Sequence, residues 1–347
     1  MRVQRIPTVL TVRRVLTVLA VLTGPAVLAA LCLAGTAQAQ GLQKIVITQP
    51  VASFSFLPLD YAKAAGYFQA EGFEVQQVAT RGGGPDIAAL VSGDVQFNAG
   101  PATQQVGALR AGRDIVNVYS FYNRSLLDVV ISKAAAARIG VPPTAPLAQR
   151  AAALKGLTLA MTRPGTITNA QLQHLTRLGG LKPTDINMVA IGDAPSMITA
   201  LSRGQIDGFA ISIPGGRISI KRGDAVMWVD NAAGDDPSVN PMIFQSLFTS
   251  RAYAKEHPGV VRGLIRAVKR AVEEIATKPA EEIRKVVQPL YSGVDPETMV
   301  LAIEAVKPAL NRKGDVTLKM AENTLLLEGS PDVTAAQMLA AYTAEYQ

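Results

Sequence analysis

The chain has 347 residues, of which 48% are hydrophobic and 18% are charged, with 29 Gly and 21 Pro. This composition supplies enough apolar material for a packed core and excludes a disordered or collagen-like chain, and the length predicts about two domains. The only apolar run long enough to span a bilayer lies at the extreme N-terminus, so we do not expect an integral membrane protein.

Residues 1–39 have the three parts of an export signal. A basic start with four arginines precedes an almost wholly apolar run from Val15 to Leu33, and Ala37-Gln38-Ala39 offers the small residues that a signal peptidase needs. We predict cleavage after Ala39 and a periplasmic location. Arg13-Arg14 leaves Sec export and twin-arginine export both open.

The predicted signal also holds the only cysteine and a large part of the positive charge. Cys32 follows a leucine rather than a small residue, so lipidation is not expected, and no disulfide or catalytic thiol is left after cleavage. The chain from Gln40 onward has 30 basic and 27 acidic residues, a net charge of +3. A broad basic surface for nucleic acid is therefore not expected.

Strands and helices alternate along the mature chain. Runs rich in β-branched and aromatic residues predict strands at 44–48, 73–78, 95–98, 114–119, 128–132, 157–161, 187–191, 206–210 and 226–229. Helices are predicted between them, the first two at 57–66 and 86–92, and a series of proline-separated helices follows Arg251. This alternation predicts an α/β fold with mainly parallel sheets.

An internal repeat predicts two lobes of like topology. A shift of 111 residues aligns Asp86–Val95 with Met197–Ile206, with Ile, Ala, Leu and Gly matched at the same spacing. The flanking strand residues agree as well. A helical solenoid would need at least three shorter repeats, so we predict a bilobal protein.

Catalytic machinery is not visible in the sequence. His174 and His257 have no metal-ligand neighbour at the spacing of a zinc motif, and we assign His174 a structural role. No serine elbow, phosphate-loop lysine motif or dinucleotide glycine fingerprint is present. We therefore predict that the protein is not an enzyme, with no metal and no cofactor.

Five loops that follow predicted strands carry the candidate binding residues. Ligands of open α/β sheets bind beyond the carboxyl ends of the strands, and exposed amides at helix N-termini favour anions. The loop 162–169, where hydroxyls cluster before an apolar helix, is the strongest candidate, and Arg81 offers a forked donor to a carboxylate or sulfonate. Each loop alone is equally typical of a plain turn, and Phe54 or Phe56 can instead cap the core. The predicted ligand-binding residues are Ser53, Phe54, Arg81, Gly82, Gly83, Asn98, Ala102, Thr103, Thr162, Gly165, Thr166, Ser212 and Pro214.

Five segments of this chain match the motifs of a known family: Ala65–Val75, Leu90–Asn98, Leu154–Ala160, Pro164-Gly165-Thr166 and Met197–Ala210. On these segments the chain resembles the periplasmic substrate-binding proteins of ABC importers in the nitrate, sulfonate and taurine group, which are related to the thiamine-precursor-binding proteins. The resemblance covers Leu42 to about Gln288. It departs from the family pattern at Gln96, where an Asp is usual, and it lacks the cysteine-rich motif of the thiamine-precursor synthases.

The resemblance implies a type II periplasmic binding fold, in which two α/β lobes close on a ligand in the cleft between them. Lobe I is expected at 40–127 and 245–347 and lobe II at 128–244, with crossing segments near 127–132 and 242–249. The implied function is capture of a small organic anion, such as a sulfonate or a carboxylate, by a monomer that delivers it to an ABC permease and its ATPase. A ligand-sensing subunit of a membrane receptor and an exported enzyme are the alternatives.

Overall fold

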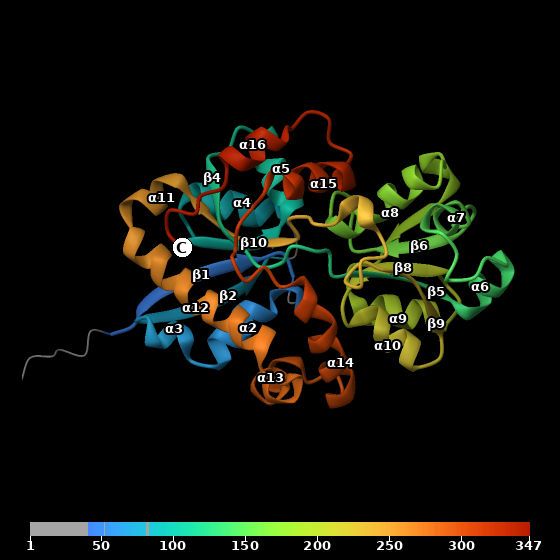
Figure 1. The fold of residues 1–347 in the computed structure, drawn as a ribbon, viewed down its shortest axis with the longest axis horizontal. Helices are drawn as coiled ribbons and strands as arrows, with labels where there is room; N and C mark the ends of the chain where they lie inside the picture. Colours follow the sequence, from blue (N-terminus) through green and yellow to red (C-terminus); the bar gives the residue numbers. More distant parts are fainter. Residues whose placement is uncertain (1–40, 52, 81–82) are drawn as a thin grey trace, which may run out of the picture. The chain divides into compact units, whose positions relative to one another are not determined.

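The computed structural model describes residues 41–51, 53–80 and 83–347 (Figure 1). The predicted export signal lies outside the described residues, as do Arg81 and Gly82 of the second predicted binding loop. Residues 43–347 form one compact unit. Among the described residues, none of the helices combines the length and the apolar character that a bilayer crossing requires.

The first sheet has five strands in the order β2-β1-β3-β10-β4. Its strands are β1 (Gln43–Gln49), β2 (Phe73–Ala79), β3 (Phe97–Pro101), β4 (Ile115–Ser120) and β10 (Gln245–Ser250). The connecting helices are α2 (Leu57–Ala64), α3 (Tyr67–Ala70), α4 (Gly83–Ser92) and α5 (Ala102–Arg110). β1 pairs parallel with β2 and β3, whereas β10 is antiparallel to both of its neighbours, β3 and β4.

The second sheet repeats this arrangement in the order β7-β6-β8-β5-β9. Its strands are β5 (Leu127–Ser132), β6 (Thr158–Met161), β7 (Asn187–Ala190), β8 (Gly208–Ser212) and β9 (Ala225–Asp230). Its helices are α6 (Lys133–Ile139), α7 (Leu147–Ala152), α8 (Ile167–Leu178), α9 (Ala194–Ser202) and α10 (Gly215–Lys221). Here β5 is the antiparallel strand, inserted between β8 and β9.

The two sheets confirm the prediction of two α/β lobes with like topology. The 111-residue shift places β2, β3, β4 and α4 onto β7, β8, β9 and α9 within a few residues. The departure at Gln96 is also explained, because its Oε1 accepts the Val46 N–H at 2.9 Å, as Asp207 Oδ2 accepts the Thr158 N–H at 2.8 Å. An amide oxygen and a carboxylate oxygen thus hold the neighbouring strand in equivalent places.

The C-terminal part is helical, as predicted. Its helices are α11 (Arg251–Glu256), α12 (Pro258–Thr277), α13 (Ala280–Val287), α14 (Pro296–Val306), α15 (Leu318–Glu328) and α16 (Ala335–Ala340). The long helix α12 buries a stripe of apolar side chains against α2 and α3, while α15 and α16 lie near α5 (Figure 1). We call the first sheet with α2–α5 and α11–α16 lobe I, and the second sheet with α6–α10 lobe II.

The chain crosses between the sheets twice, at residues 121–126 and 231–244. The crossings predicted at 127–132 and 242–249 are misplaced, because 127–132 is β5 and most of 242–249 belongs to β10. Both apolar runs pair with strands of the sheet that they enter. Each run is therefore a buried internal strand of that sheet and not a connection between the two sheets.

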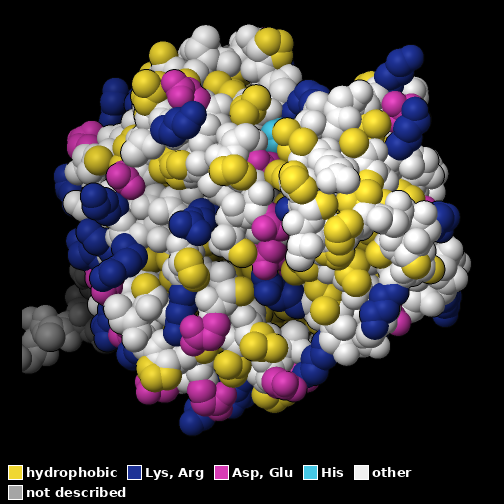
Figure 2. All heavy atoms as spheres, turned by 45° about the vertical axis from the view of Figure 1, so that its right-hand side comes forward, with side chains coloured by type: hydrophobic (Ala, Val, Ile, Leu, Met, Phe, Trp, Pro, Cys, Tyr) yellow, Lys and Arg dark blue, Asp and Glu magenta, His cyan; other side chains and the backbone are white. Residues whose placement is uncertain are grey.

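Charged side chains of both signs are interspersed on the face shown in Figure 2. Ion pairs among the described residues include Arg266 with Glu71 and Arg312 with Glu273. A further group joins the two lobes, since Lys221 Nζ at the end of α10 lies 2.8 Å from Asp295 Oδ1 and 2.7 Å from Glu297 Oε2 at the start of α14. These exposed pairs add little stability individually.

We expect Gly314→Ala to lower the free energy of unfolding by at least about 2 kcal/mol. Gly314 has φ +71°, and an added Cβ would lie 2.2 Å from Cε2 of the buried Tyr119 ring. Gly72 has φ +85° but no atom within 4 Å of such a Cβ, so Gly72→Ala isolates the backbone strain, about 1 kcal/mol. Chemical denaturation measures the free energy of unfolding of both variants. An equal loss in the two variants would show that the Tyr119 ring moves aside without an energetic cost.

Candidate functional site

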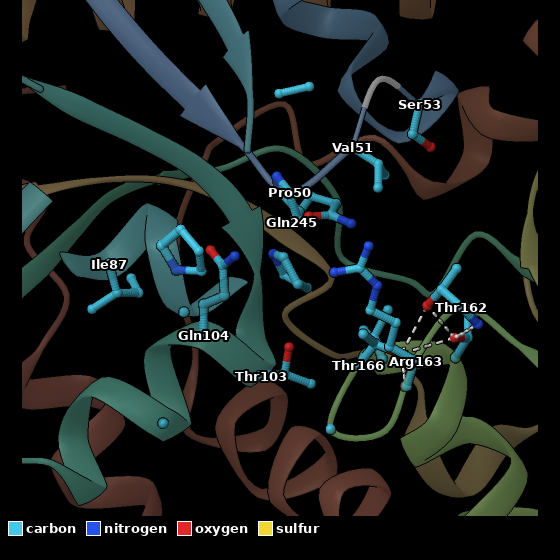
Figure 3. Close-up of a pocket in the computed structure, with 18 of the residues that line it drawn as sticks. Pro50, Val51, Ser53, Ile87, Thr103, Gln104, Thr162, Arg163, Thr166 and Gln245 are labelled. Carbon is cyan, nitrogen blue, oxygen red and sulfur yellow. Dashed lines mark hydrogen bonds between the residues drawn. The ribbon is translucent and has the colours of Figure 1, made fainter. Parts of the chain in front are cut away.

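A cavity of about 1370 Å³ is lined by residues of both lobes (Figure 3). Lobe I contributes the loop after β1, the last residues of β2 and β3, the helices α4 and α5, the residues directly after α5 and the first residue of β10. Lobe II contributes the loops after β6 and β7 and the end of β8. The cavity therefore lies at the carboxyl ends of parallel strands in both sheets, where open α/β sheets bind ligands.

Six of the predicted binding residues line this cavity, two from lobe I and four from lobe II. They are Ser53, Thr103, Thr162, Gly165, Thr166 and Ser212. Ser53 caps a short 3-10 helix, because its Oγ accepts the Ser55 N–H, and Thr103 lies in the first turn of α5. Residues more than 150 positions apart in the sequence are thus brought to one cavity.

Asn98 and Ala102 do not line the cavity, and the reason is the length of β3. The strand ends at Pro101, so Asn98 is internal to the sheet, fully buried, with its Nδ2 donating to Thr48. Ala102 is also fully buried, and its N–H donates to the Phe244 carbonyl. Both expectations are corrected here.

Phe54 and Pro214 also lie away from the cavity. Phe54 is 3% exposed and packs edge-on against Tyr291 in the core of lobe I, whereas its neighbours Ser55 and Phe56 line the cavity. Pro214 sits at the N-terminus of α10, and its carbonyl accepts the Ile218 N–H. The backbone turns away from the cavity there, so only the preceding Ser212 and Ile211 reach it.

The glycine-rich second loop is described only in part. Arg81 and Gly82 lie outside the described residues. Gly83 is the first residue of α4, which begins three residues earlier than predicted, and the next two residues, Gly84 and Pro85, line the cavity.

Three threonine hydroxyls form a closed cluster at the lobe II side. Thr162 Oγ1 lies 2.8 Å from Thr166 Oγ1 and 2.7 Å from Thr168 Oγ1, and the last two are 3.0 Å apart. The Thr162 N–H donates to Thr168, and the Thr166 hydroxyl donates to the Arg163 carbonyl. The cluster fixes the tight turn that joins β6 to α8.

This arrangement leaves the N-terminus of α8 without a side-chain cap. Thr166 is the N-cap residue, yet its hydroxyl bonds within the cluster rather than to the first-turn amides. The first N–H groups of a helix have no partner within it, and together with the helix dipole they attract negative charge. In Figure 3 the side chain of Arg163 extends from the same loop into the cavity, so positive potential gathers at this end.

The lobe I wall is built from amides and a buried carboxyl. Gln104 and Gln245 both line the cavity and are 7% and 5% exposed. Gln104 Nε2 donates to Asp86 Oδ2 at 2.8 Å, which orients the amide. Burial raises the pKa of Asp86 above its ordinary value, although hydrogen bonds from Thr80 and Gln104 lower it in part. This wall thus presents the amides of Gln104 and Gln245 to the cavity, and Arg113 of lobe I lines the cavity as well.

Sequence reasoning missed several lining residues. Arg163 stands inside the strongest predicted loop, and Ile191-Gly192-Asp193 occupies the repeat position of 80–82, so both left a signal in the sequence. Gln104 lies next to the predicted Thr103 on α5, whereas Gln245 left no signal, because its approach depends on the pairing of β10 with β3. Asp193 is already engaged, since its Oδ1 accepts the Ser196 N–H at the start of α9.

No cluster of three or more His, Cys, Asp or Glu able to hold a metal ion occurs within the part of the chain that the structure describes. The two repeated α/β lobes, with one cavity at the carboxyl ends of both sheets, define the fold of the periplasmic binding proteins.

Residues 53–282 match the model of the "NMT1/THI5 like" family, and the chain belongs to that family. Among curated proteins, none matches this sequence. A solved protein of Bordetella bronchiseptica RB50 is similar at 26% identity, with a TM-score of 0.75 over 87% of this chain and 95% of that one.

Two more distant structures share the fold. The periplasmic aliphatic sulphonate binding protein SsuA from Escherichia coli is 16% identical, with a TM-score of 0.64 over 83% of this chain and 91% of its own. The periplasmic nitrate-binding protein NrtA from Synechocystis PCC 6803 is 13% identical, with a TM-score of 0.68 over 88% of this chain and 87% of its own. These likenesses confirm the resemblance and the fold predicted from the sequence.

Proposed function

We propose that this protein is a periplasmic solute-binding protein that captures a small organic anion between its lobes and delivers it to an ABC importer. The observation that carries the proposal is the uncapped N-terminus of α8, which lies beside the threonine cluster and Arg163 at the cavity. Backbone amides, hydroxyls and a guanidinium are the donors that carboxylates and sulfonates accept. The fold shared with sulphonate-binding and nitrate-binding proteins supports the same class of ligand.

Capture works through closure of the two lobes. The cavity of about 1370 Å³ exceeds the roughly 300–1,000 Å³ of an ordinary small-molecule pocket, so a small ligand does not fill it. A ligand that gains contacts with lobe I only after closure shifts the population toward the closed form. In this proposal the lobes comprise residues 40–127 with 245–347 and 128–244, and the rotation occurs in the two crossing segments.

The closed form is what the membrane partners recognise. A permease that docks on both lobes distinguishes closed from open protein, and its ATPase then drives release and transport. The protein acts as a monomer, without nucleic acid, cofactor or metal, and without catalysis. The alternative, a ligand-sensing subunit of a membrane receptor, would use the same closure with a different partner.

The proposal is tested by the affinity for organic anions. We expect methanesulfonate, butanesulfonate or benzoate to raise the thermal midpoint of the chain from Gln40 onward in a dose-dependent manner, because each binds only folded protein. Arg163→Gln should weaken the binding of the active compound by about tenfold to a hundredfold, since a charge-assisted hydrogen bond is lost. Isothermal titration measures the change.

Arg203→Gln is the matched control, because Arg203 is an exposed arginine at the end of α9 that does not line the cavity. Its affinity should equal that of the wild type. Unchanged affinity in Arg163→Gln would contradict the location of the anion site at the α8 end of the cavity. Chemical conversion of a bound compound would favour an exported enzyme instead.

A further inference from the structure

The cavity does not end at the cleft between the lobes but continues along α4 and α5 of lobe I. On α4 it is lined by Ile87, Ala88, Val91 and Ser92, and on α5 and directly after it by Thr103, Gln104, Gly107, Ala108, Ala111 and Arg113. Residues three and four apart lie on one face of a helix, so each set forms a single stripe. Two parallel stripes therefore make a groove that leads away from the cleft.

The chemistry of the groove differs from that of the cleft. Thr103 and Gln104 carry polar groups at the cleft end, and Ser92 and Arg113 carry polar groups at the far end. The lining residues between these two ends are aliphatic or glycine. From Thr103 to Ala111 the groove runs for about 12 Å, at 1.5 Å per helical residue. The middle of the groove is therefore an apolar stretch between two polar ends.

The groove is unfilled in this structure. Val91 is 40% exposed, which is unusual for a valine in a helix against the domain, and Ala88 is exposed as well. An added Cβ at Gly107 would meet no atom within 4 Å, and the same holds for Gly84 at the mouth. The small residues thus leave space for part of a ligand. Burial of the exposed apolar surface by that part of the ligand would stabilise the complex.

We propose that this groove is an apolar subsite that binds the extended nonpolar part of an organic anion. The inference rests on the proposed function, because the charged end of the same ligand lies at the N-terminus of α8, across the cleft. The ligand class is thereby narrowed to amphipathic anions with a chain or flat ring that reaches from lobe II to α5. Inorganic anions and the shortest organic acids leave the groove empty and are weak ligands.

Gly107 sets the depth to which the nonpolar part can enter. It lies beyond Thr103 and Gln104 by one helical turn, and its missing side chain keeps the groove open at that point. A leucine at this position would place its Cβ at least 4 Å from other atoms and extend its side chain into the groove. It would also raise the intrinsic helix propensity of α5, so the fold should be retained.

The test is a series of straight-chain acids, acetate, butanoate, hexanoate and octanoate, titrated against wild type and Gly107→Leu. In the wild type the affinity should rise about fourfold with each added methylene while the chain extends into the groove. In Gly107→Leu the rise should stop early, so the ratio of wild-type to variant affinity grows with chain length. Gly259→Leu is the matched control, since Gly259 lies near the start of α12 with no atom near an added Cβ and is not part of the cavity.

The outcomes separate this inference from the proposed function. Equal affinity for all four acids in the wild type, or an unchanged rise in Gly107→Leu, would overturn the apolar subsite while leaving anion capture in place. Failure of every acid and sulfonate to bind would overturn both. Thermal unfolding of Gly107→Leu, expected at or above the wild-type midpoint, shows that a lost rise reflects the groove and not unfolding.

Discussion

Asp236→Ala is expected to lower the free energy of unfolding by about 3–5 kcal/mol, because it leaves a buried partner unpaired. The Asp236 side chain is 1% exposed, and its Oδ2 lies 2.8 Å from Nε2 of His174, which is 5% exposed. Its Oδ1 accepts the Ser238 N–H and hydroxyl. The structural role that the sequence suggested for His174 thus has a named partner.

The location of the Asp236–His174 pair means that Asp236→Ala also affects ligand binding. Asp236 belongs to the second crossing segment, and His174 lies on α8, whose N-terminus faces the cavity. The pair therefore fixes the crossing segment to the helix that presents the anion site. We expect the variant to lose ligand affinity together with stability, because one of the contacts that hold α8 in place is lost, although Arg177 of α8 still donates to the Leu326 and Leu327 carbonyls of α15.

Asp332→Ala provides the comparison in chemical denaturation. Asp332 pairs with Arg110, but both side chains are about half exposed, and exposed pairs contribute roughly 0–1 kcal/mol. Equal losses in the two variants would mean that the Asp236 site rearranges or admits water. Burial raises the pKa of Asp236, but hydrogen bonds from His174 and Ser238 outweigh it and hold the pKa below its ordinary value, so this contribution is lost only in acid.

The second large effect is a dependence of stability on pH that originates at Asp128. This side chain is fully buried between β8 and β9, beside Arg217 and Asp230. Burial raises its pKa to about 8, against an opposing effect of Arg217, whose Nε lies 3.4 Å from Asp128 Oδ2, while Asp230 raises it further. The folded protein therefore binds a proton that the unfolded chain has released.

The sign of the dependence follows from that proton. A carboxyl with a raised folded pKa stabilises the fold fully at low pH, and the contribution is lost as the pH rises from about 4 to about 8. Asp128→Asn cannot ionise, so its free energy of unfolding, measured relative to wild type, should increase across this range. Urea denaturation at a series of pH values measures the difference.

Asp332→Asn is the control for the pH series, because hydrogen bonding to Arg110 lowers the pKa of Asp332. Its difference from wild type should change only in acid. A flat difference for Asp128→Asn would show that Asp128 is ionised in the folded protein and paired with Arg217 throughout.

The sequence predicted residues that line the cavity where the lining depends on local order along the chain. Thr162 and Thr166 were found because hydroxyls directly before an apolar helix mark its start, and Ser212 because it ends a β-branched run. Asn98 and Ala102 were misjudged because the strand end was placed three residues early. Glycine and proline at the end of β3 look like a turn, yet pairing with β10 keeps them in the sheet.

Residues that depend on distant pairing could not be predicted in this way. Gln245 reaches the cavity only because β10 enters the first sheet between β3 and β4. Phe54 was predicted to bind ligand, with packing in the core as the alternative, and the core position results from Tyr291, far along the chain, which packs on Phe54. Burial against remote segments selects among alternatives that local patterns leave equal.

The position of β10 in the first sheet also determines the order in which the protein can fold, because β10 follows all five strands of the second sheet in the chain. All five strands of the second sheet lie within residues 127–230, so that lobe can assemble as soon as this stretch leaves the ribosome or the translocation channel. The first sheet has a gap between β3 and β4 until β10 arrives, after the entire second lobe. The lobe whose strands come first in the chain is therefore the last to be completed, and its two open strand edges must be kept from other chains until then.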